Sequence, residues 1–249
     1  MSSLTSSNRL WCLLPAAGIG QRMGSSLPKQ YLPLTGQTLL EVTLGRLHQA
    51  FPEAILVLPL HAEDLWWPAA ELSFSKRYPQ AKIMTCLGGK ERADSVLNGL
   101  NALAQFAKPN DWVLVHDVAR PCVTQQDLHQ LYQTLQDHPV GGLLAAPVAD
   151  TMKRGQNSDS HTSYQEVCAT LDRNQLWHAL TPQMFRFNKL HSALSQGLAK
   201  GLNLTDESSA LETAGYQPLL IPGRRDNIKV THPEDLPLAE LLLTHQQTI

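Results

Sequence analysis

The chain has 249 residues and a mass of 27.5 kDa, a length that corresponds to one or two domains. Hydrophobic residues make up 43%, charged residues 17%, and the formal net charge is -2, which excludes a disordered chain and argues against a basic nucleic-acid binder. No apolar run approaches the roughly 20 residues of a membrane helix, so we expect a cytoplasmic protein.

The N-terminal half shows the alternation of an α/β fold. Residues 1–9 are polar and predict a flexible leader before a single domain over residues 10–249. Short apolar runs at 10–14, 54–60, 81–87 and 112–115 predict buried parallel strands. Thr38 and Glu41 have the spacing of a capping box, and a second helix is expected to begin near Glu91. Helical periodicity between the runs then predicts a mostly parallel sheet with helices on both faces.

The C-terminal half begins with another expected strand at 141–147. The polar stretch that follows, about 148–172, predicts a protruding arm with a loop tip near residues 155–160. Helices are expected at 190–198, 207–213 and 236–244, and a strand at 216–221. Pro233 suits the start of the last helix. Since no repeat or sharp change of composition occurs, one domain with an arm is preferred over two domains.

A glycine-containing segment directly after the first strand has the features of a polyphosphate cradle. Gly18 and Gly20 allow close approach of a phosphate, and Arg22 and Lys29 supply positive charge. The glycine spacing is one residue too long for the dinucleotide fingerprint, and no P-loop motif occurs. An ordinary turn with two solvated cations is the alternative.

Two further segments carry acids near basic residues. Asp117 lies just after the strand expected at 112–115 and is followed by Arg120, which suggests a ligand for a divalent cation beside an anion contact at the carboxyl edge of the sheet. Asp226 and Lys229 form a similar pair before the last helix. The simpler alternatives are a strand-end cap for Asp117 and a solvated turn for Asp226.

Other chemistries are disfavoured. The ten histidines include no pair at zinc spacing, and no nucleophile elbow occurs. We expect His116 to be a packed, hydrogen-bonded histidine, Trp66 and Trp67 to serve packing, and Cys12, Cys86, Cys122 and Cys168 to be reduced core thiols.

The ordered segments PAAGIGQRM, PKQY, GGKERADSV, VLVHDVARP, APVADTMK, DRNQLWHALTPQ and DNIKVTHPEDL together resemble the 2-C-methyl-D-erythritol 4-phosphate cytidylyltransferases of isoprenoid biosynthesis. The resemblance runs from about residue 10 to 243. It implies a Rossmann-like fold, transfer of a cytidylyl group from CTP to 2-C-methyl-D-erythritol 4-phosphate with release of pyrophosphate, Mg²⁺ as cofactor, and a homodimer joined through the arm.

The resemblance also assigns roles to individual residues, grouped here by the part of the reaction that they serve. Catalysis falls to Arg22 and Lys29; nucleotide binding to Ala16, Ala17, Gly18, Gly89, Lys90 and Ser95; acceptor binding to Arg120, Thr151, Arg173 and Lys229; and metal binding to Asp117 and Asp226. Thr151 and Arg173 are expected to reach the site from the partner's arm.

Two positions depart from the family pattern, and two rival functions stay open. Val118 replaces a smaller residue, and Lys90 stands where an acid or small polar residue is common. One rival is a nucleotidyltransferase for ribitol 5-phosphate or a sugar phosphate, and the other is a module that binds CTP without chemistry. The presence of both Arg22 and Lys29 argues against the second, because charge aimed at a transition state contributes little to simple binding.

Overall fold

The computed structural model describes residues 8–18, 27–156 and 164–248. The leader, the segment around Arg22 and the expected arm tip therefore lie largely outside the described residues. The elements run in chain order as β1 (Leu10–Leu13), η2 (Lys29–Tyr31), β2 (Pro33–Leu34), β3 (Gln37–Thr38), α1 (Leu39–Ala50), β4 (Ile55–Leu60), α2 (Trp67–Arg77), β5 (Lys82–Leu87), α3 (Arg92–Leu103), β6 (Trp112–Val115), α4 (Gln125–Leu135), β7 (Gly141–Pro147), β8 (Met152–Gln156), β9 (Glu166–Leu171), β10 (Trp177–Arg186), α5 (Phe187–Ala199), α6 (Glu207–Thr213), β11 (Leu219–Pro222) and α7 (Asp235–Thr248).

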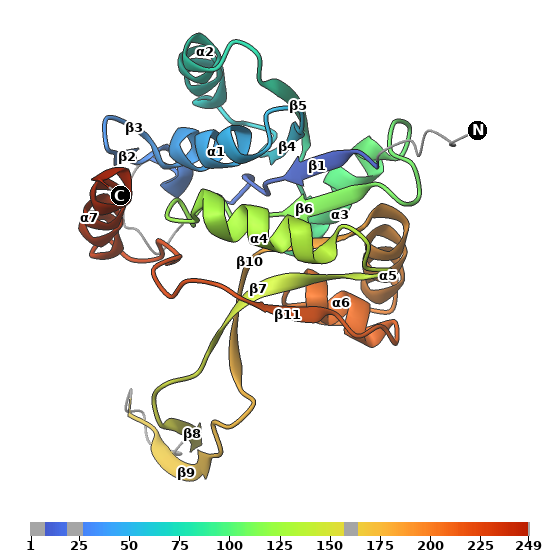
Figure 1. Ribbon diagram of the computed structural model, residues 1–249, viewed down its shortest axis with the longest axis vertical. Coiled ribbons are helices and arrows are strands. Elements are labelled where there is room, and N and C mark those ends of the chain that lie inside the picture. The colour runs from blue at the N-terminus through green and yellow to red at the C-terminus, as the bar shows by residue number, and fades with distance from the viewer. Residues whose placement is uncertain (1–7, 19–26, 157–163, 249) are drawn as a thin grey trace.

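A seven-stranded sheet with the order β11-β7-β10-β6-β1-β4-β5 forms the centre of the molecule (Figure 1). Strands β6, β1, β4 and β5 are parallel to one another, and β11 is parallel to β7. Strand β10 is antiparallel to both of its neighbours, β6 and β7. The prediction of a mostly parallel sheet is therefore confirmed.

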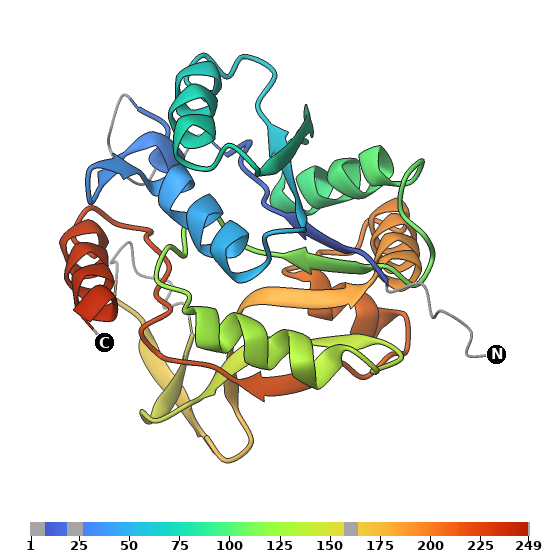
Figure 2. The same cartoon turned by 45° about the horizontal axis from the view of Figure 1, so that its top comes forward.

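Helices cover both faces of this sheet, as the apolar strands predict. The expectation of a buried strand at 81–87 is wrong, because β5 lies at the edge of the sheet and has no buried residue. On β1, Cys12 packs in the core that contains the buried faces of α1, α2 and α4, whereas Trp11 and Leu13 pack in the core with α3, α5 and α6. A third group of buried residues joins α7 to β2 and α1. Figure 2 shows α7 beside the small hairpin that β2 forms with β3. No helix among the described residues is long and apolar enough to cross a membrane.

Local signals placed several element ends correctly. Thr38 Oγ1 accepts a hydrogen bond from Glu41 N (3.2 Å) and Thr38 N donates to Glu41 Oε2 (2.8 Å), so the capping box of α1 is confirmed. The last helix begins at Asp235, two residues after Pro233, close to the expected start at 236. The last strand is an exception, because it begins at Leu219 and not at the expected residue 216.

Strand β10 was not predicted as a strand. Thr181, Pro182, Gln183 and Arg186 interrupt its apolar pattern, yet residues 180–186 are buried. Thr181, Gln183 and Arg186 are tolerated there because their side chains find polar partners on neighbouring segments.

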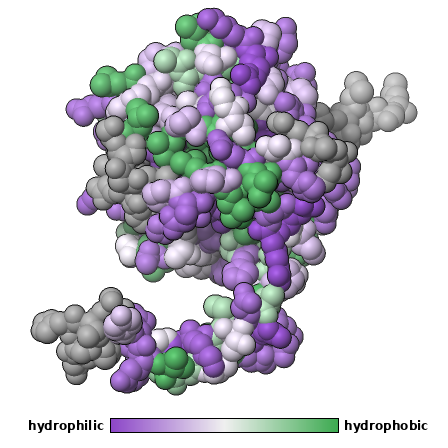
Figure 3. All heavy atoms as spheres, turned by 90° about the vertical axis from the view of Figure 1, so that its left-hand side faces the viewer, coloured by the Kyte–Doolittle hydropathy of each residue, from purple (hydrophilic) through white to green (hydrophobic). Residues whose placement is uncertain are grey.

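The polar segment after β7 forms an antiparallel hairpin of β8 and β9 that extends away from the sheet, and Figure 3 shows it standing clear of the body. Strand β8 continues to Gln156, so Gly155 lies in a strand and not in the loop tip. The expectation of core thiols is wrong for two of the four cysteines. Cys12 and Cys122 are buried, but Cys86 on the edge strand β5 is only half-buried, and Cys168 on β9 is exposed because neither strand of the hairpin packs against the core. All four thiols are unpaired.

Candidate active site

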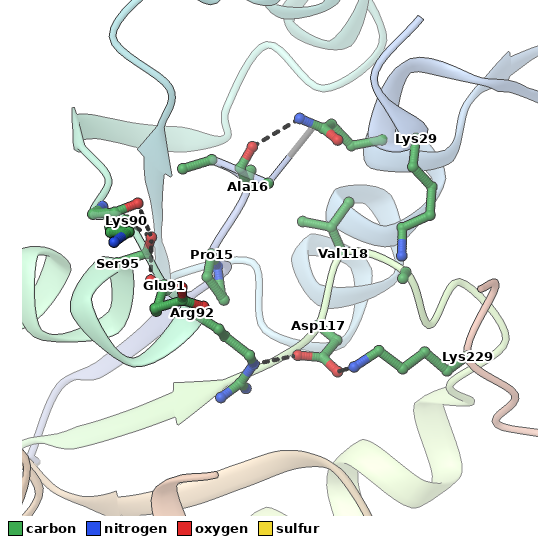
Figure 4. A pocket seen from close by; sticks show the side chains of 15 residues that line it. Pro15, Ala16, Lys29, Lys90, Glu91, Arg92, Ser95, Asp117, Val118 and Lys229 are labelled. Atoms are coloured by element: carbon green, nitrogen blue, oxygen red, sulfur yellow. Dashed lines mark hydrogen bonds and ion pairs between the residues drawn. The ribbon is translucent and has the colours of Figure 1, made fainter. Parts of the chain in front are cut away.

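A cavity of about 330 Å³ opens at the carboxyl ends of β1, β5 and β6, the edge at which parallel sheets bind ligands (Figure 4). Its lining residues come from loops far apart in the sequence: Pro15, Ala16, Ala17, Gly18, Lys29, Gln30, Gly89, Lys90, Glu91, Arg92, Ser95, Asp117, Val118, Ala119 and Lys229. Four of them are cations and two are carboxylates, so the described lining carries a positive excess that suits an anionic ligand.

The first wall consists of the loop after β1 and the short helix η2. Ala16 N donates to Pro59 O (2.9 Å), and Gln30 Nε2 donates to Ala16 O (2.8 Å), which ties the two segments together. The half-buried Lys29 directs its side chain into the cavity, as Figure 4 shows. Arg22 and Gly20 lie outside the described residues, so the predicted cradle is described only from Pro15 to Gly18 and again from Leu27 onward.

The second wall is the turn between β5 and α3. A Cβ atom at Gly88 would lie 2.3 Å from the Cβ of Ala17, so only glycine lets the two walls approach this closely. Ser95 Oγ accepts from Gly89 N (3.0 Å) and donates to Glu91 O (3.1 Å), which fixes the backbone ahead of α3. Lys90 is exposed at the rim.

Asp117 lies on the floor of the cavity with three cations around it. Lys229 Nζ is 2.7 Å from Oδ2, Arg92 Nε is 2.9 Å from Oδ1, and Arg120 Nε is 3.9 Å from Oδ2. Burial alone would raise the pKa of Asp117, but the charges of Arg92 and Lys229 hold its pKa well below the ordinary value. The carboxylate is therefore ionised throughout the physiological range.

His116 fixes the loop that carries Asp117. Its imidazole is fully buried, Nδ1 lies 3.0 Å from Thr181 Oγ1, and Nε2 lies 3.0 Å from Arg120 O. Thr181 Oγ1 in turn accepts from Asp117 N (3.0 Å). Because Asp117 N and the Arg120 carbonyl have fixed polarities, Nε2 carries the proton and Nδ1 accepts. Burial lowers the pKa of His116 to about 4, and the expectation of a packed, hydrogen-bonded histidine is confirmed.

The other predicted acid does not meet Asp117 at the cavity. Asp226 forms an ion pair with Arg224 (2.5 Å) and is not among the lining residues. No group of three or more histidine, cysteine or acidic side chains able to hold a metal occurs in the described part of the chain. A divalent cation that binds through one or two carboxylates and substrate phosphates still fits the floor, because the two oxygens of Asp117 retain free lone pairs beside their two short contacts.

The predicted acceptor residues separate into two groups. Lys229 lines the cavity and contacts Asp117 there. Arg120 does not line the cavity, and its Nη1 donates to Asn227 O (2.7 Å). Thr151 and Arg173 are exposed at the base of the hairpin and do not line this cavity; Arg173 Nη1 donates to Ala149 O.

Among the lining residues that the sequence did not assign to the site, Arg92 and Gln30 make side-chain contacts that shape the cavity. Arg92 was hidden among the polar residues of the first helical turn, where an exposed cation needs no explanation. No short-range pattern relates it to Asp117, which lies 25 residues later in the chain. Gln30 adjoins Lys29, and an uncharged side chain gives no sign that it will bond a backbone carbonyl.

Comparisons with known proteins agree with this geometry. A family model described as 2-C-methyl-D-erythritol 4-phosphate cytidylyltransferase matches residues 10–245. The enzyme of that name from Hahella chejuensis is 49% identical over 236 residues, 95% of this chain and 93% of the relative. Its counterpart from Chromohalobacter salexigens is 51% identical over 237 residues, 95% of this chain and 90% of the relative.

Two solved structures share the fold along nearly the whole chain. A 4-diphosphocytidyl-2C-methyl-D-erythritol synthase has a TM-score of 0.78 at 34% identity, covering 95% of this chain and 99% of its own. The Francisella tularensis 2-C-methyl-D-erythritol 4-phosphate cytidylyltransferase has a TM-score of 0.76 at 32% identity, covering 94% and 99%. This chain therefore belongs to the 2-C-methyl-D-erythritol 4-phosphate cytidylyltransferase family.

Proposed function

We propose that the cavity at the ends of β1, β5 and β6 is where this enzyme transfers the cytidylyl group of CTP to 2-C-methyl-D-erythritol 4-phosphate in isoprenoid biosynthesis. The observation that carries the proposal is the positive lining around a buried, ionised carboxylate at the ligand-binding edge of the sheet. Both substrates are phosphate esters, and such a lining compensates their charge.

The nucleotide is expected to lie between the two walls. Backbone atoms of Ala16, Ala17 and Gly18 face the triphosphate, and Gly89, Lys90 and Ser95 surround the cytosine. Backbone groups suit the reading of a base edge because their positions are fixed, and Ser95 fixes the backbone of Gly89 directly. The side chain of Lys90 is exposed, so its contribution is expected from the main chain.

The chemical step needs charge neutralisation more than proton transfer. An oxygen of the methylerythritol phosphate attacks the α-phosphorus of CTP, and the bond to the leaving pyrophosphate breaks with its electron pair. The attacking oxygen is already anionic, so no general base is required. Lys29, together with Arg22, is proposed to stabilise the charge on the pentacoordinate phosphorus.

A divalent cation, proposed to be Mg²⁺, would be held by Asp117 together with phosphate oxygens of CTP, with Asp226 as a second ligand, directly or through water. When bound, it supplies further positive charge to the triphosphate. The contribution of Asp226 would require its carboxylate to leave Arg224, to which it is paired.

The acceptor is proposed to bind Lys229 and Arg120 from one protomer and Thr151 and Arg173 from its partner. The projecting hairpin supports this arrangement, because it carries the last two residues away from the cavity of their own chain. The enzyme is accordingly proposed to be a homodimer joined through the arm. We place it in the cytoplasm, which the four unpaired thiols suit.

Acceptor choice is tested by incubating the purified protein with CTP and Mg²⁺ and with each of several polyol phosphates in parallel, while following pyrophosphate release. The methylerythritol phosphate should give the highest kcat/KM. Faster turnover of ribitol 5-phosphate would reverse the assignment, and no turnover with CTP bound would favour a binding module.

A further inference from the structure

We propose that Glu207, which does not line the cavity, is a positioning residue that holds Arg92 and balances its charge, so that Asp117 keeps a negative charge available to the cation–CTP complex. This inference rests on the proposed function of the cavity. It assigns a role in the reaction to a side chain on α6, outside every loop that forms the cavity walls.

Glu207 and Arg92 form a bidentate ion pair. Arg92 Nη1 lies 2.7 Å from Glu207 Oε1, and Nη2 lies 3.1 Å from Oε2. The third donor of the same guanidinium, Nε, reaches Asp117 Oδ1 at 2.9 Å. Glu207 is only 1% exposed, so this carboxylate is buried with Arg92 as its cation. One planar group thus sets the distance and orientation between a remote acid and the floor of the cavity.

The start of α6 is itself fixed by the central sheet. Gln183 on β10 donates from Nε2 to Asp206 Oδ2 (2.8 Å), and its Oε1 accepts from Ser208 N (2.8 Å). The residues on either side of Glu207 are therefore bound to one buried amide, which is 1% exposed. This anchoring leaves Glu207 little freedom to follow Arg92 if the guanidinium moves, so Arg92 is held in place by a rigid partner.

The charges along this chain of contacts determine what the site prefers to bind. Glu207 and Asp117 compensate two of the three cations Arg92, Arg120 and Lys229, so the five groups together carry one net positive charge. Without the charge of Glu207, this net charge rises to two beneath the triphosphate. CTP alone is then attracted more strongly, whereas a divalent cation bound at Asp117 is repelled. The two effects have opposite signs, which a general loss of structure cannot produce.

A purely architectural bridge between α3 and α6 is the competing explanation. If Glu207 only joins these helices, its substitution lowers the melting temperature and weakens CTP binding equally with and without the cation. The discriminating quantity is therefore the ratio of two dissociation constants for CTP, one measured in Mg²⁺ and one in EDTA.

The experiment uses the full chain and calorimetric titration with CTP. Glu207→Gln keeps the size and one acceptor but removes the charge; the control, Glu212→Gln, removes a charge from an exposed residue of the same helix. We expect the Mg²⁺ to EDTA ratio of dissociation constants to rise about tenfold in Glu207→Gln, because the charge of Glu207 is separated from Asp117 only by the guanidinium of Arg92, with contacts of 2.7 and 2.9 Å, and acts at an effective dielectric constant of about 20 with partial screening. The control should leave the ratio unchanged.

Arg92→Lys provides a second variant, which decides the matter if Glu207→Gln does not fold. Lysine keeps the charge but cannot bridge two carboxylates with a planar fork, so binding in Mg²⁺ should weaken more than binding in EDTA. An unchanged ratio in the folded variants would overturn the role of Glu207. Failure of the native protein to bind CTP under either condition would instead refute the proposed function of the cavity.

Discussion

Replacement of His116 by glutamine tests how the loop that carries Asp117 is held. The imidazole is fully buried in its neutral form, and burial lowers its pKa to about 4 from the ordinary 6.5. In the unfolded chain this group takes up a proton near pH 6.5, but in the folded protein it does so only near pH 4. Folding therefore becomes less favourable as the pH falls between these values, at about 1.4 kcal/mol per pH unit. By pH 5 the loss from this group reaches about 2 kcal/mol.

His116→Gln removes the titration and keeps an amide donor for the Arg120 carbonyl. The free energy of unfolding is measured by urea denaturation at pH 7 and pH 5, at one protein concentration because the stability of the proposed dimer would depend on it. Between these pH values the variant should lose about 2 kcal/mol less than the native protein. As a control, the exposed His61 is replaced by glutamine. The free energy of unfolding of this variant should change between the two pH values as much as that of the native protein. Equal losses in His116→Gln and the native protein would show that the buried imidazole is not neutral in the fold.

Two further variants test the catalytic and acceptor assignments. Lys29→Ala should lower kcat by at least about a hundredfold while sparing CTP affinity, by analogy with removal of one oxyanion donor; steady-state kinetics with pyrophosphate detection would show this, and an unchanged kcat would remove Lys29 from the chemical step. Arg173→Ala should raise the KM for the methylerythritol phosphate with little change in the KM for CTP, and full activity of a monomeric form would contradict a site shared between protomers.

The elements that could be predicted from sequence are those whose signal is local. Strands β1, β4, β6 and β7 are continuous apolar runs, and β5 is a weaker run interrupted by Thr85. The spacing of Thr38 and Glu41 marks the start of α1. Strand β10 carries no such run, because its buried polar side chains gain their stability from partners that the sequence does not place nearby. Gln183, for example, bonds residues of α6 more than twenty positions later.

The candidate site shows the same division. Asp117 and Lys29 were identifiable because an acid at a strand end and a cation after a glycine-containing loop are short-range patterns. Arg92 and Glu207 were not, since 115 residues separate them and only the packing of α3 against α5 and α6 brings them together. Long-range ion pairs of this kind depend on the fold, and a charged residue on a helix looks solvent-exposed until the fold is known.

The cavity between the loop after β1 and the start of α3 is proposed to hold the triphosphate of CTP. A crystal structure of the protein with CTP and Mg²⁺ tests it most directly. We expect triphosphate oxygens within hydrogen-bond distance of Lys29 Nζ and of backbone amides in residues 16–18, with the cation near Asp117. A nucleotide bound elsewhere, with the Lys29 amine directed away from its phosphates, would contradict it.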